Sequence, residues 1–334
     1  MDNILKTITT LKGEYFIIKD DNGKLLFKKH LTKSIENEVN GYNSIKDIYN
    51  VPKLLSFDFA KNEIIYEYND NLYNKTLHKG LFGDIDFDMN KIINSITQGF
   101  EHYELLKEDI STDSCFFQGR VPNVEKYLNL NSKSYNKIII CNQIALPSFK
   151  MVVKNIINGI SKNQTVPVII SQGDPTDLNI SINGMISDFE VSGKNSLINE
   201  IAIFIGCYVV NCYYYYIKYI NSPHKYYTDT LKNMSQFINC DYKETKNAIF
   251  VNFSRLLPHK IKEFILTYLY KIKSMNIIDN DFLIGPYIAM RMISPINIDT
   301  VNNEKDKYLL FSLAGLFEQE YNTLDKIIEF ITKF

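Results

Sequence analysis

The chain contains 334 residues, a length that favours two domains or two lobes of one larger unit. Hydrophobic residues make up 45% and charged residues 22%, a balance typical of a globular protein with a sizeable core. The formal net charge of −1 argues against a general nucleic-acid-binding protein, whose binding domain is usually clearly basic.

The five cysteines show no zinc-type spacing, and an odd number in a chain this long does not indicate a disulfide scaffold, so buried reduced thiols are expected. The N-terminal residues lack the apolar core of a secretion signal, which predicts a cytoplasmic location. Residues 201–220 have the length of a bilayer span, but Asn211, Lys218 and six tyrosines favour a core helix. We expect no membrane partner and no nucleic-acid partner, and the sequence does not define the oligomeric state.

The first seventy residues are predicted to form strands and one helix, in the order strand, strand, strand, helix, strand, strand. Strand-like runs at 13–20 and 24–29 flank Asp21-Asn22-Gly23, a strong signal for a hairpin turn. The helix is expected from Ser34 to about Tyr49, with Ser34 as its N-cap. Two more strands are expected at 53–57 and 63–68.

Helical periodicity replaces this pattern further along the chain. Residues 89–106 and 148–160 are predicted to be helices, and 166–170 a short buried strand. Residues 109–147 are less regular and are treated as an insertion of uncertain structure. Beyond Asp188 the pattern predicts an almost wholly helical chain. We therefore place a lobe boundary near residue 70, with an N-terminal lobe over 1–69 and a C-terminal lobe over 70–334.

An acidic residue and an amide residue follow the predicted strand at 166–170. Asp174 and Asn179 lie five residues apart in Gln172-Gly-Asp-Pro-Thr-Asp-Leu-Asn179. On a tight loop, a carboxylate can accept the proton of a substrate hydroxyl while an amide oxygen binds a metal ion. Alone, this spacing is weak in an Asn-rich chain, and a simple turn explains it equally well.

A third residue makes the pattern more specific. Asn183-Gly184 marks a hairpin turn that would return Asp188 to the side of Asn179, so that both reach one Mg²⁺. Phe189 would then anchor the loop in the core, and Glu190 would orient the site. This is the arrangement that a kinase-type phosphoryl transfer requires.

The segment from Gln172 to Asn179, followed by Asp188-Phe-Glu190, resembles the catalytic and metal loops of the aminoglycoside phosphotransferase and choline kinase group. These are small-molecule kinases with a protein-kinase-like fold. The likeness covers roughly residues 165–205 and extends more loosely over 13–70. Family members usually carry His-Gly-Asp where this chain has Gln172-Gly-Asp174, which puts the role of the usual histidine in doubt.

The resemblance implies an α+β fold with two lobes, a small antiparallel N-lobe sheet with one helix and a larger, mainly helical C-lobe. It also implies a lysine on the third strand, paired with a helix glutamate, that binds the nucleotide phosphates. We choose Lys28, because Leu26-Phe27 is the usual apolar lead-in, and pair it with Glu38; Lys29 remains open. Ordinary surface charges are the alternative for these residues.

Two further nucleotide contacts follow from the resemblance. Glu67 and Tyr68, at the end of a strand, match the hinge where adenine meets backbone groups. The turn Thr9–Gly13 is the candidate for covering the phosphates, although it lacks a full glycine signature.

We therefore expect a phosphotransferase that uses ATP or GTP and Mg²⁺. Asp174 would be the catalytic base, and Asn179 and Asp188 would hold the metal. The acceptor would be a hydroxyl of a small molecule such as an aminoglycoside, a choline-like amino-alcohol or a sugar. Two alternatives remain: a nucleotide-binding pseudokinase acting as an interaction module, and a helical scaffold that binds no nucleotide.

Overall fold

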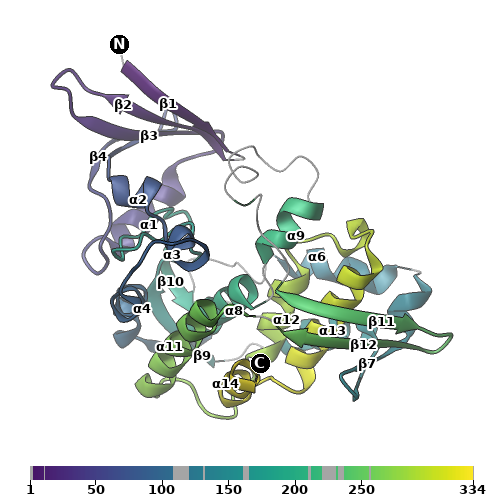
Figure 1. Cartoon of the computed structure of the whole chain (residues 1–334). Helices are drawn as coiled ribbons and strands as arrows, with labels where there is room; N and C mark the ends of the chain where they lie inside the picture. The colour runs from purple at the N-terminus through teal and green to yellow at the C-terminus, as the bar shows by residue number, and fades with distance from the viewer. Residues whose placement is uncertain are drawn as a thin grey trace. The chain divides into compact units, whose positions relative to one another are not determined.

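The computed structural model describes residues 3–10, 12–107, 120–130, 132–160, 165–209, 212–219, 231, 237–255 and 257–333. By internal packing the chain forms two compact units (Figure 1). Unit 1 contains the described residues of Met1–His102, Ile169–Asn195 and Ser222–Asn233, and unit 2 those of Tyr103–Val168, Ser196–Asn221 and Met234–Phe334. The proposed lobes, 1–69 and 70–334, have other bounds and stay a prediction.

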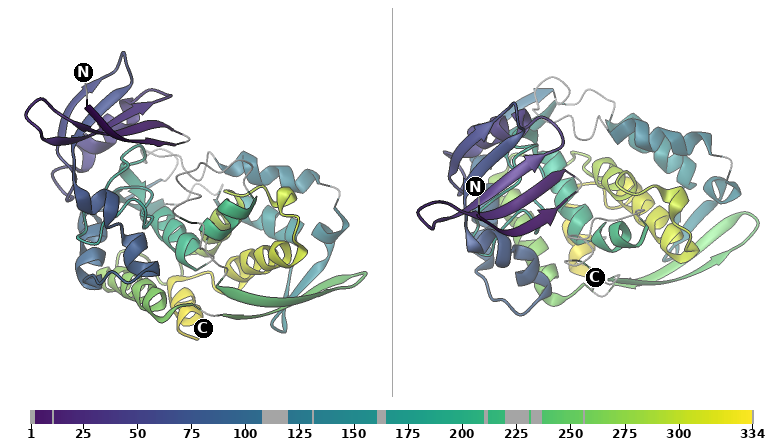
Figure 2. Two further views of the ribbon diagram at one scale, coloured as in Figure 1. Left: turned by 45° about the horizontal axis from the view of Figure 1, so that its top comes forward. Right: turned by 90° about the horizontal axis from the view of Figure 1, so that it is seen from above.

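Unit 1 begins with a five-stranded antiparallel sheet in the order β1-β2-β3-β5-β4. Strands β1, β2 and β3 lie side by side in both views of Figure 2. The five strands are β1 (Asn3–Thr9), β2 (Gly13–Lys19), β3 (Leu25–Leu31), β4 (Leu54–Asp58) and β5 (Glu63–Glu67). The predicted order of strands and helix is confirmed, and so is the turn before β3, where Asp20 N–H donates to Lys24 O at 2.9 Å.

Helix α1 (Glu36–Ile45) packs its apolar side on one face of this sheet. Val39, Tyr42 and Ile45, each three residues from the next, join Phe27 and Tyr66 in one buried cluster, because residues three or four apart lie near one another on a helix surface. The expected N-cap is wrong by one residue. Ile35 holds the cap position, and Ser34 Oγ accepts only the Glu36 N–H, at 3.2 Å.

The single helix expected over 89–106 is also wrong. Helix α4 (Met89–Thr97) ends in a 3₁₀ turn, η1 (Gln98–Glu101), and Glu104–Lys107 forms strand β6. Gly99 lies in the 3₁₀ turn, where the chain passes close to the backbone of Ile170. A Cβ at this position would lie 2.3 Å from the Ile170 carbonyl oxygen. Unit 1 also contains two short helices, α2 (Asp70–Asn74) and α3 (Leu77–Phe82).

Unit 2 contains most of the helices and a second sheet. Its helical elements are α6 (Val121–Glu125), η3 (Lys126–Asn129), η4 (Lys133–Asn136), α7 (Phe149–Ile160), α8 (Leu197–Tyr208), α9 (Cys212–Tyr219), α11 (His259–Met275), α12 (Gly285–Ile293), η5 (Ile298–Thr300), α13 (Glu304–Gln319) and α14 (Leu324–Lys333). The predicted helix at 148–160 is confirmed as α7.

The expectation of helices throughout the chain after Asp188 is wrong. Strand β10 (Gly193–Ser196) precedes α8, and β11 (Ile238–Glu244) and β12 (Ala248–Arg255) form a hairpin. Burial alternates at the start of β11, where Ile238 and Cys240 face inward, as a half-buried strand requires.

Part of the uncertain insertion at 109–147 belongs to the same sheet as this hairpin. Strands β7 (Ile138–Cys141) and β8 (Ile144–Leu146) extend it in the order β11-β12-β7-β8. The pairing of β12 with β7 is parallel, whereas the other two pairings are antiparallel. Residues 109–119 of the insertion lie outside the described residues.

Strand β9 (Thr165–Ser171) carries the chain from unit 2 into unit 1 and pairs antiparallel with β6. It confirms the short strand predicted before the Asp174 loop. Five of its seven residues are buried. A buried strand fixes the start of the loop that follows it.

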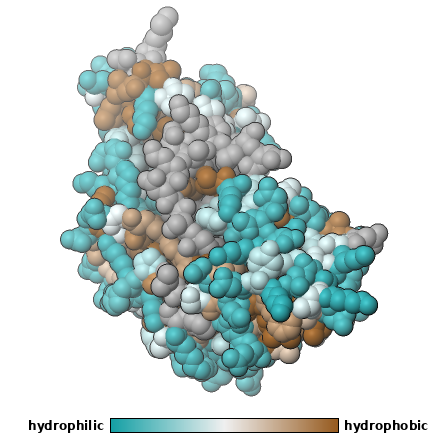
Figure 3. All heavy atoms as spheres, turned by 45° about the vertical axis from the view of Figure 1, so that its right-hand side comes forward, coloured by the Kyte–Doolittle hydropathy of each residue, from teal (hydrophilic) through white to brown (hydrophobic). Residues whose placement is uncertain are grey.

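The apolar segment 201–220 is divided between α8, which is buried along its whole length, and α9. Among the described residues, none of the helices has both the length and the apolar character that a bilayer span requires. The expected buried thiols are confirmed for Cys141 and Cys240, where burial raises the pKa to about 12 and about 11. On the face shown in Figure 3, hydrophobic side chains gather beside the N-terminal strand, where Ile4 and Leu5 are exposed.

Candidate active site

The loop after β9 folds tightly around the backbone of Asp174. Its carbonyl accepts the Thr176 N–H at 2.6 Å and the Asn179 Nδ2 at 3.0 Å. Gly173 has a φ of +84°, and a Cβ there would lie 2.1 Å from the Val191 carbonyl. Only glycine fits this position, so the Asp174 loop and the segment after Asp188 pack backbone to backbone.

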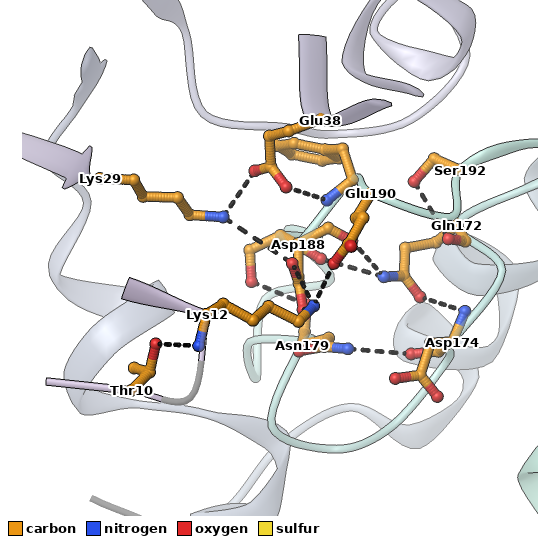
Figure 4. A network of polar contacts seen from close by, with 12 residues as sticks. Thr10, Lys12, Lys29, Glu38, Gln172, Asp174, Asn179, Asp188, Glu190 and Ser192 are labelled. Atoms are coloured by element: carbon orange, nitrogen blue, oxygen red, sulfur yellow. Dashed lines mark hydrogen bonds and ion pairs between the residues drawn. The ribbon is translucent and has the colours of Figure 1, made fainter. Parts of the chain in front are cut away.

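The predicted hairpin between Asn179 and Asp188 is confirmed. Ile180 bridges Ile186 in antiparallel fashion, and Ser187 N–H donates to Asn179 O at 2.9 Å. This pairing returns the chain so that Asn179 and Asp188 lie on neighbouring turns (Figure 4). Asp188 has a φ of +62°, a left-handed conformation that Asp tolerates better than most residues.

Gln172 joins the two loops through its side chain. Its Nε2 donates to the carbonyls of Asp188 at 2.6 Å and Ser187 at 3.2 Å, and its Oε1 accepts the Asp174 N–H at 2.9 Å (Figure 4). The residue is buried. A neutral imidazole has one donor and one acceptor, so the amide here makes one more contact than the usual histidine could. Gln172 therefore bridges the Asp174 loop and the Asp188 loop.

The lysine paired with Glu38 is Lys29, and the expected pair with Lys28 is wrong. Lys29 Nζ lies 2.5 Å from Glu38 Oε1, and both side chains are buried. Successive side chains of a strand point to opposite faces, so Lys28 lies on the other side of β3 and pairs with Glu63 at 3.0 Å. There it lines a shallow pocket with Ile4, Phe16, Ile18, His30 and Glu63.

Glu38 links the sheet, α1 and the Asp188 loop. Its Oε1 also accepts the Tyr66 hydroxyl at 3.2 Å, and its Oε2 accepts the Phe189 N–H at 3.2 Å. Phe189 packs in the core against Tyr42 and Tyr66, as expected of an anchor. At Gly41, a Cβ would lie 1.9 Å from the Phe189 carbonyl, so a bulkier residue there would push α1 off the loop.

Two lysines surround the Asp188 carboxylate. Lys12 Nζ lies 3.0 Å from Oδ2, and Lys29 Nζ lies 3.9 Å from Oδ1 (Figure 4). Burial alone would raise the pKa of Asp188, but the charges of Lys29 and Lys12 outweigh it and hold the pKa below its ordinary value. Burial would likewise lower the pKa of Lys29, which the charges of Glu38 and Asp188 instead raise. Asp188 and Lys29 are therefore both charged at neutral pH.

The donor set at the two turns fits a small divalent cation. Asn179 Nδ2 donates a hydrogen bond to the Asp174 carbonyl, so the amide oxygen of Asn179 is the atom that could bind a metal ion. Asp188 adds a carboxylate. Over the described ranges, no three His, Cys, Asp or Glu side chains cluster as a metal site of their own. A cation here would take these two ligands and complete its shell with nucleotide phosphates and water, as Mg²⁺ commonly does.

The hinge residues are placed at the end of β5, as predicted, but their N–H groups already have backbone partners. Glu67 N–H donates to Lys53 O at 2.8 Å, and Tyr68 N–H donates to Leu25 O at 3.4 Å. The Glu67 side chain pairs with Lys24 at 2.7 Å. The expected contact of adenine with backbone groups at Glu67 and Tyr68 stays a prediction.

A further contact, which sequence reasoning missed, holds the Asp174 loop from the side of α3. His78 Nδ1 lies 2.7 Å from Asp177 Oδ2, and both side chains are buried. His78 N–H also donates to Asp177 O at 3.1 Å, and Leu77 N–H to Ile180 O at 2.7 Å. Nothing in the sequence spacing signals this contact, because 99 residues separate the two partners.

The comparisons with known proteins give matches among solved structures alone. No family model matches the chain, and no curated protein does. Similar structures include choline kinase LicA from Streptococcus pneumoniae, at 12% identity and a TM-score of 0.43, with 96% of this chain and 95% of that chain covered. Macrolide 2′-phosphotransferase MphH from Brachybacterium faecium has 8% identity and a TM-score of 0.46, with 94% and 92% covered. Amicoumacin kinase hAmiN, in complex with AMP-PNP and Ca²⁺, has 11% identity and a TM-score of 0.44, with 96% and 89% covered.

These structures belong to the group of small-molecule kinases that the loops around Asp174 and Asp188 resemble. Their identities and TM-scores give this chain neither an activity nor a substrate.

Proposed function

We propose that the chain is a small-molecule kinase that transfers the γ-phosphoryl group of ATP or GTP to a hydroxyl. The observation that carries the proposal is the gathering of five polar residues in one unit. A buried Lys29–Glu38 pair, the Asp188 carboxylate, the Asn179 amide and the Asp174 loop lie together, although they come from three separate parts of the chain. A partly buried carboxylate next to two lysines and an amide oxygen supports a site for a metal ion and phosphates.

Asp174 would accept the proton of the acceptor hydroxyl while the hydroxyl oxygen forms a bond to the γ-phosphorus. The bond between the γ-phosphorus and the β-phosphate oxygen breaks in the same transfer, and the nucleoside diphosphate leaves. The backbone of Asp174 is held for this role on both sides, because its N–H donates to Gln172 Oε1 and its carbonyl accepts Asn179 Nδ2.

Lys29 would contact the α- and β-phosphates, and Glu38 would keep its ammonium in place. Asn179 and Asp188 would hold Mg²⁺, which when bound neutralises charge on the phosphates. The acceptor is a small molecule with a free hydroxyl, for which an aminoglycoside, a choline-like amino-alcohol and a sugar are the candidates.

The test is ATP and GTP turnover with Mg²⁺ over a panel of these acceptors, for the wild type and for Asp174→Asn. Loss of a positioned base should reduce turnover by about 10²–10⁴-fold, while the affinity for Mg·AMP-PNP stays close to that of the wild type. Tight nucleotide binding without turnover on any acceptor would instead indicate the pseudokinase. An unchanged melting temperature at saturating Mg·ATP would contradict nucleotide binding altogether.

A further inference from the structure

Lys12 stands on the turn between β1 and β2 with a firmly held backbone. Its carbonyl accepts the N–H and the hydroxyl of Thr32, at 2.9 and 3.1 Å, and its N–H donates to Thr10 Oγ1 at 3.2 Å. The side chain, in contrast, is 44% exposed. A fixed backbone and a free four-carbon stem let the ammonium exchange partners without moving the turn.

The ammonium of Lys12 occupies the oxygens that a metal would use. It lies 3.0 and 3.3 Å from the two Oδ atoms of Asp188 and 2.7 Å from Glu190 Oε2 (Figure 4). A divalent cation bound to Asp188 would repel an ammonium at this distance. One of the two lysines next to Asp188 would have to withdraw, and Lys29 is buried against Glu38.

Resting on the proposed function, we propose that Lys12 is a second phosphate-binding lysine that exchanges places with the metal. Its ammonium holds Asp188 and Glu190 before the nucleotide binds, and it moves to the phosphates when the metal–nucleotide complex takes over Asp188. The anion that arrives with the metal supplies the new partner. Lys12 therefore competes with the metal alone and supports the metal–nucleotide complex.

This exchange couples the two ligands. Removal of the ammonium should raise the affinity for the metal ion alone and lower the affinity for the metal–nucleotide complex. The binding of the metal ion then increases the affinity for the nucleotide less than it does in the wild type. A lysine that served only to stabilise the fold would not change the two affinities in opposite directions.

The experiment measures Mn²⁺ binding by electron paramagnetic resonance and AMP-PNP binding in the presence of Mn²⁺ by calorimetry, for the wild type and Lys12→Met. Because the contact is partly exposed, Lys12→Met should bind Mn²⁺ alone about two- to fivefold more tightly. It should bind AMP-PNP with Mn²⁺ about tenfold more weakly, from the loss of a charged hydrogen bond. Lys12→Arg keeps the charge, and both of its affinities should lie between those of the wild type and those of Lys12→Met.

Lys61→Met is the matched control, because Lys61 is exposed on the turn between β4 and β5 and its ammonium pairs with Asp58, away from Asp188 and Glu190. It should leave both affinities unchanged. If Lys12→Met binds Mn²⁺ no more tightly, or AMP-PNP no more weakly, than the wild type, the exchange is wrong and the proposed function stands. If the wild type itself binds no AMP-PNP with Mn²⁺, the proposed function and the phosphate role of Lys12 fall together.

Discussion

Both units contain a cluster of charges, but the two clusters are built differently. In unit 2, Asp306 Oδ2 accepts from Lys218 Nζ at 2.8 Å, from the Tyr214 hydroxyl at 3.2 Å and from the Tyr219 hydroxyl. One carboxylate and one ammonium balance each other there, and neutral hydroxyls complete the contacts. In this cluster the two charged groups are each other's partners, so no charge is left over for a ligand.

The cluster of unit 1 is not balanced. Glu38, Asp188 and Glu190 contribute three carboxylates, and Lys12 and Lys29 contribute two ammonium groups. One negative charge is therefore left at the point where a cation is expected. If the proposed function is right, this uncompensated negative charge is what separates the ligand site of unit 1 from the structural cluster around Asp306.

The largest effect is expected from removing the buried lysine. Lys29→Met should weaken Mg·AMP-PNP binding about tenfold or more and reduce turnover by about 10²-fold or more, because the phosphates lose a preorganised charge. Lys28→Met removes a lysine one residue away, on the opposite face, and should change neither quantity. Calorimetry and steady-state turnover measure both.

A control for folding belongs with this prediction. Lys29→Met leaves Glu38 buried without its cation, at a cost of about 3–5 kcal/mol. The double variant Lys29→Met with Glu38→Gln removes that buried charge and should regain stability without regaining nucleotide affinity. Equal losses from Lys28→Met and Lys29→Met would show that the face of β3 does not matter.

Gln172 gives the next largest effect. Gln172→Ala removes three hydrogen bonds and leaves the Asp174 N–H and the Asp188 carbonyl without a side-chain partner. We expect a loss of about 2 kcal/mol in unfolding free energy and a larger loss in turnover than in nucleotide affinity, because both loops lose their bridge.

Gln172→His sharpens this prediction through pH. Neutral imidazole can accept the Asp174 N–H and donate to the Asp188 carbonyl, but protonated imidazole has no acceptor. The histidine variant should therefore approach the wild type above about pH 7 and lose turnover below about pH 6, around the ordinary histidine pKa. The wild type should show no such loss in that interval. A flat profile for the variant would argue against the bridge.

The sequence alone predicted the parts of unit 1 that depend on local signals. The turn Asp21-Asn22-Gly23, the Asn183-Gly184 hairpin and the burial of Phe189 follow from residue types at short range. The choice between Lys28 and Lys29 failed because it depends on which face of β3 meets α1, which is a matter of packing and not of motif. The apolar lead-in is compatible with both.

Contacts over long distances in the sequence were out of reach. Lys12 and Asp188 are 176 residues apart, and His78 and Asp177 are 99 apart. In unit 2, β11 was missed because it carries Asn, Asp, Lys and Glu at positions that also suit a polar helix, and β12 because a short apolar run also suits a buried helix. The pairing of β12 with β7, more than 100 residues earlier, decides the structure there.

The smallest effect is expected at a second balanced anchor of unit 2. Glu244 accepts from Lys137 Nζ and from the Tyr308 hydroxyl, both at 2.7 Å, and these contacts hold its pKa below the ordinary value. A lowered pKa means that the stabilisation is fully present above the pKa of the unfolded state, about 4.3, and is lost as the pH falls through the folded-state pKa below it. Glu244→Gln should therefore lower the unfolding free energy by about 1 kcal/mol at pH 7.

That difference should shrink as the pH falls below about 4.5, since the wild type then loses the charge that the variant lacks. Urea unfolding at several pH values between 7 and 3.5 measures it, and Mg·AMP-PNP affinity at pH 7 should be the same for both proteins. A variant that loses nucleotide affinity as strongly as Lys29→Met would show that the charge clusters of the two units do not have separate roles. Balanced charge would then be no sign of a purely structural contact.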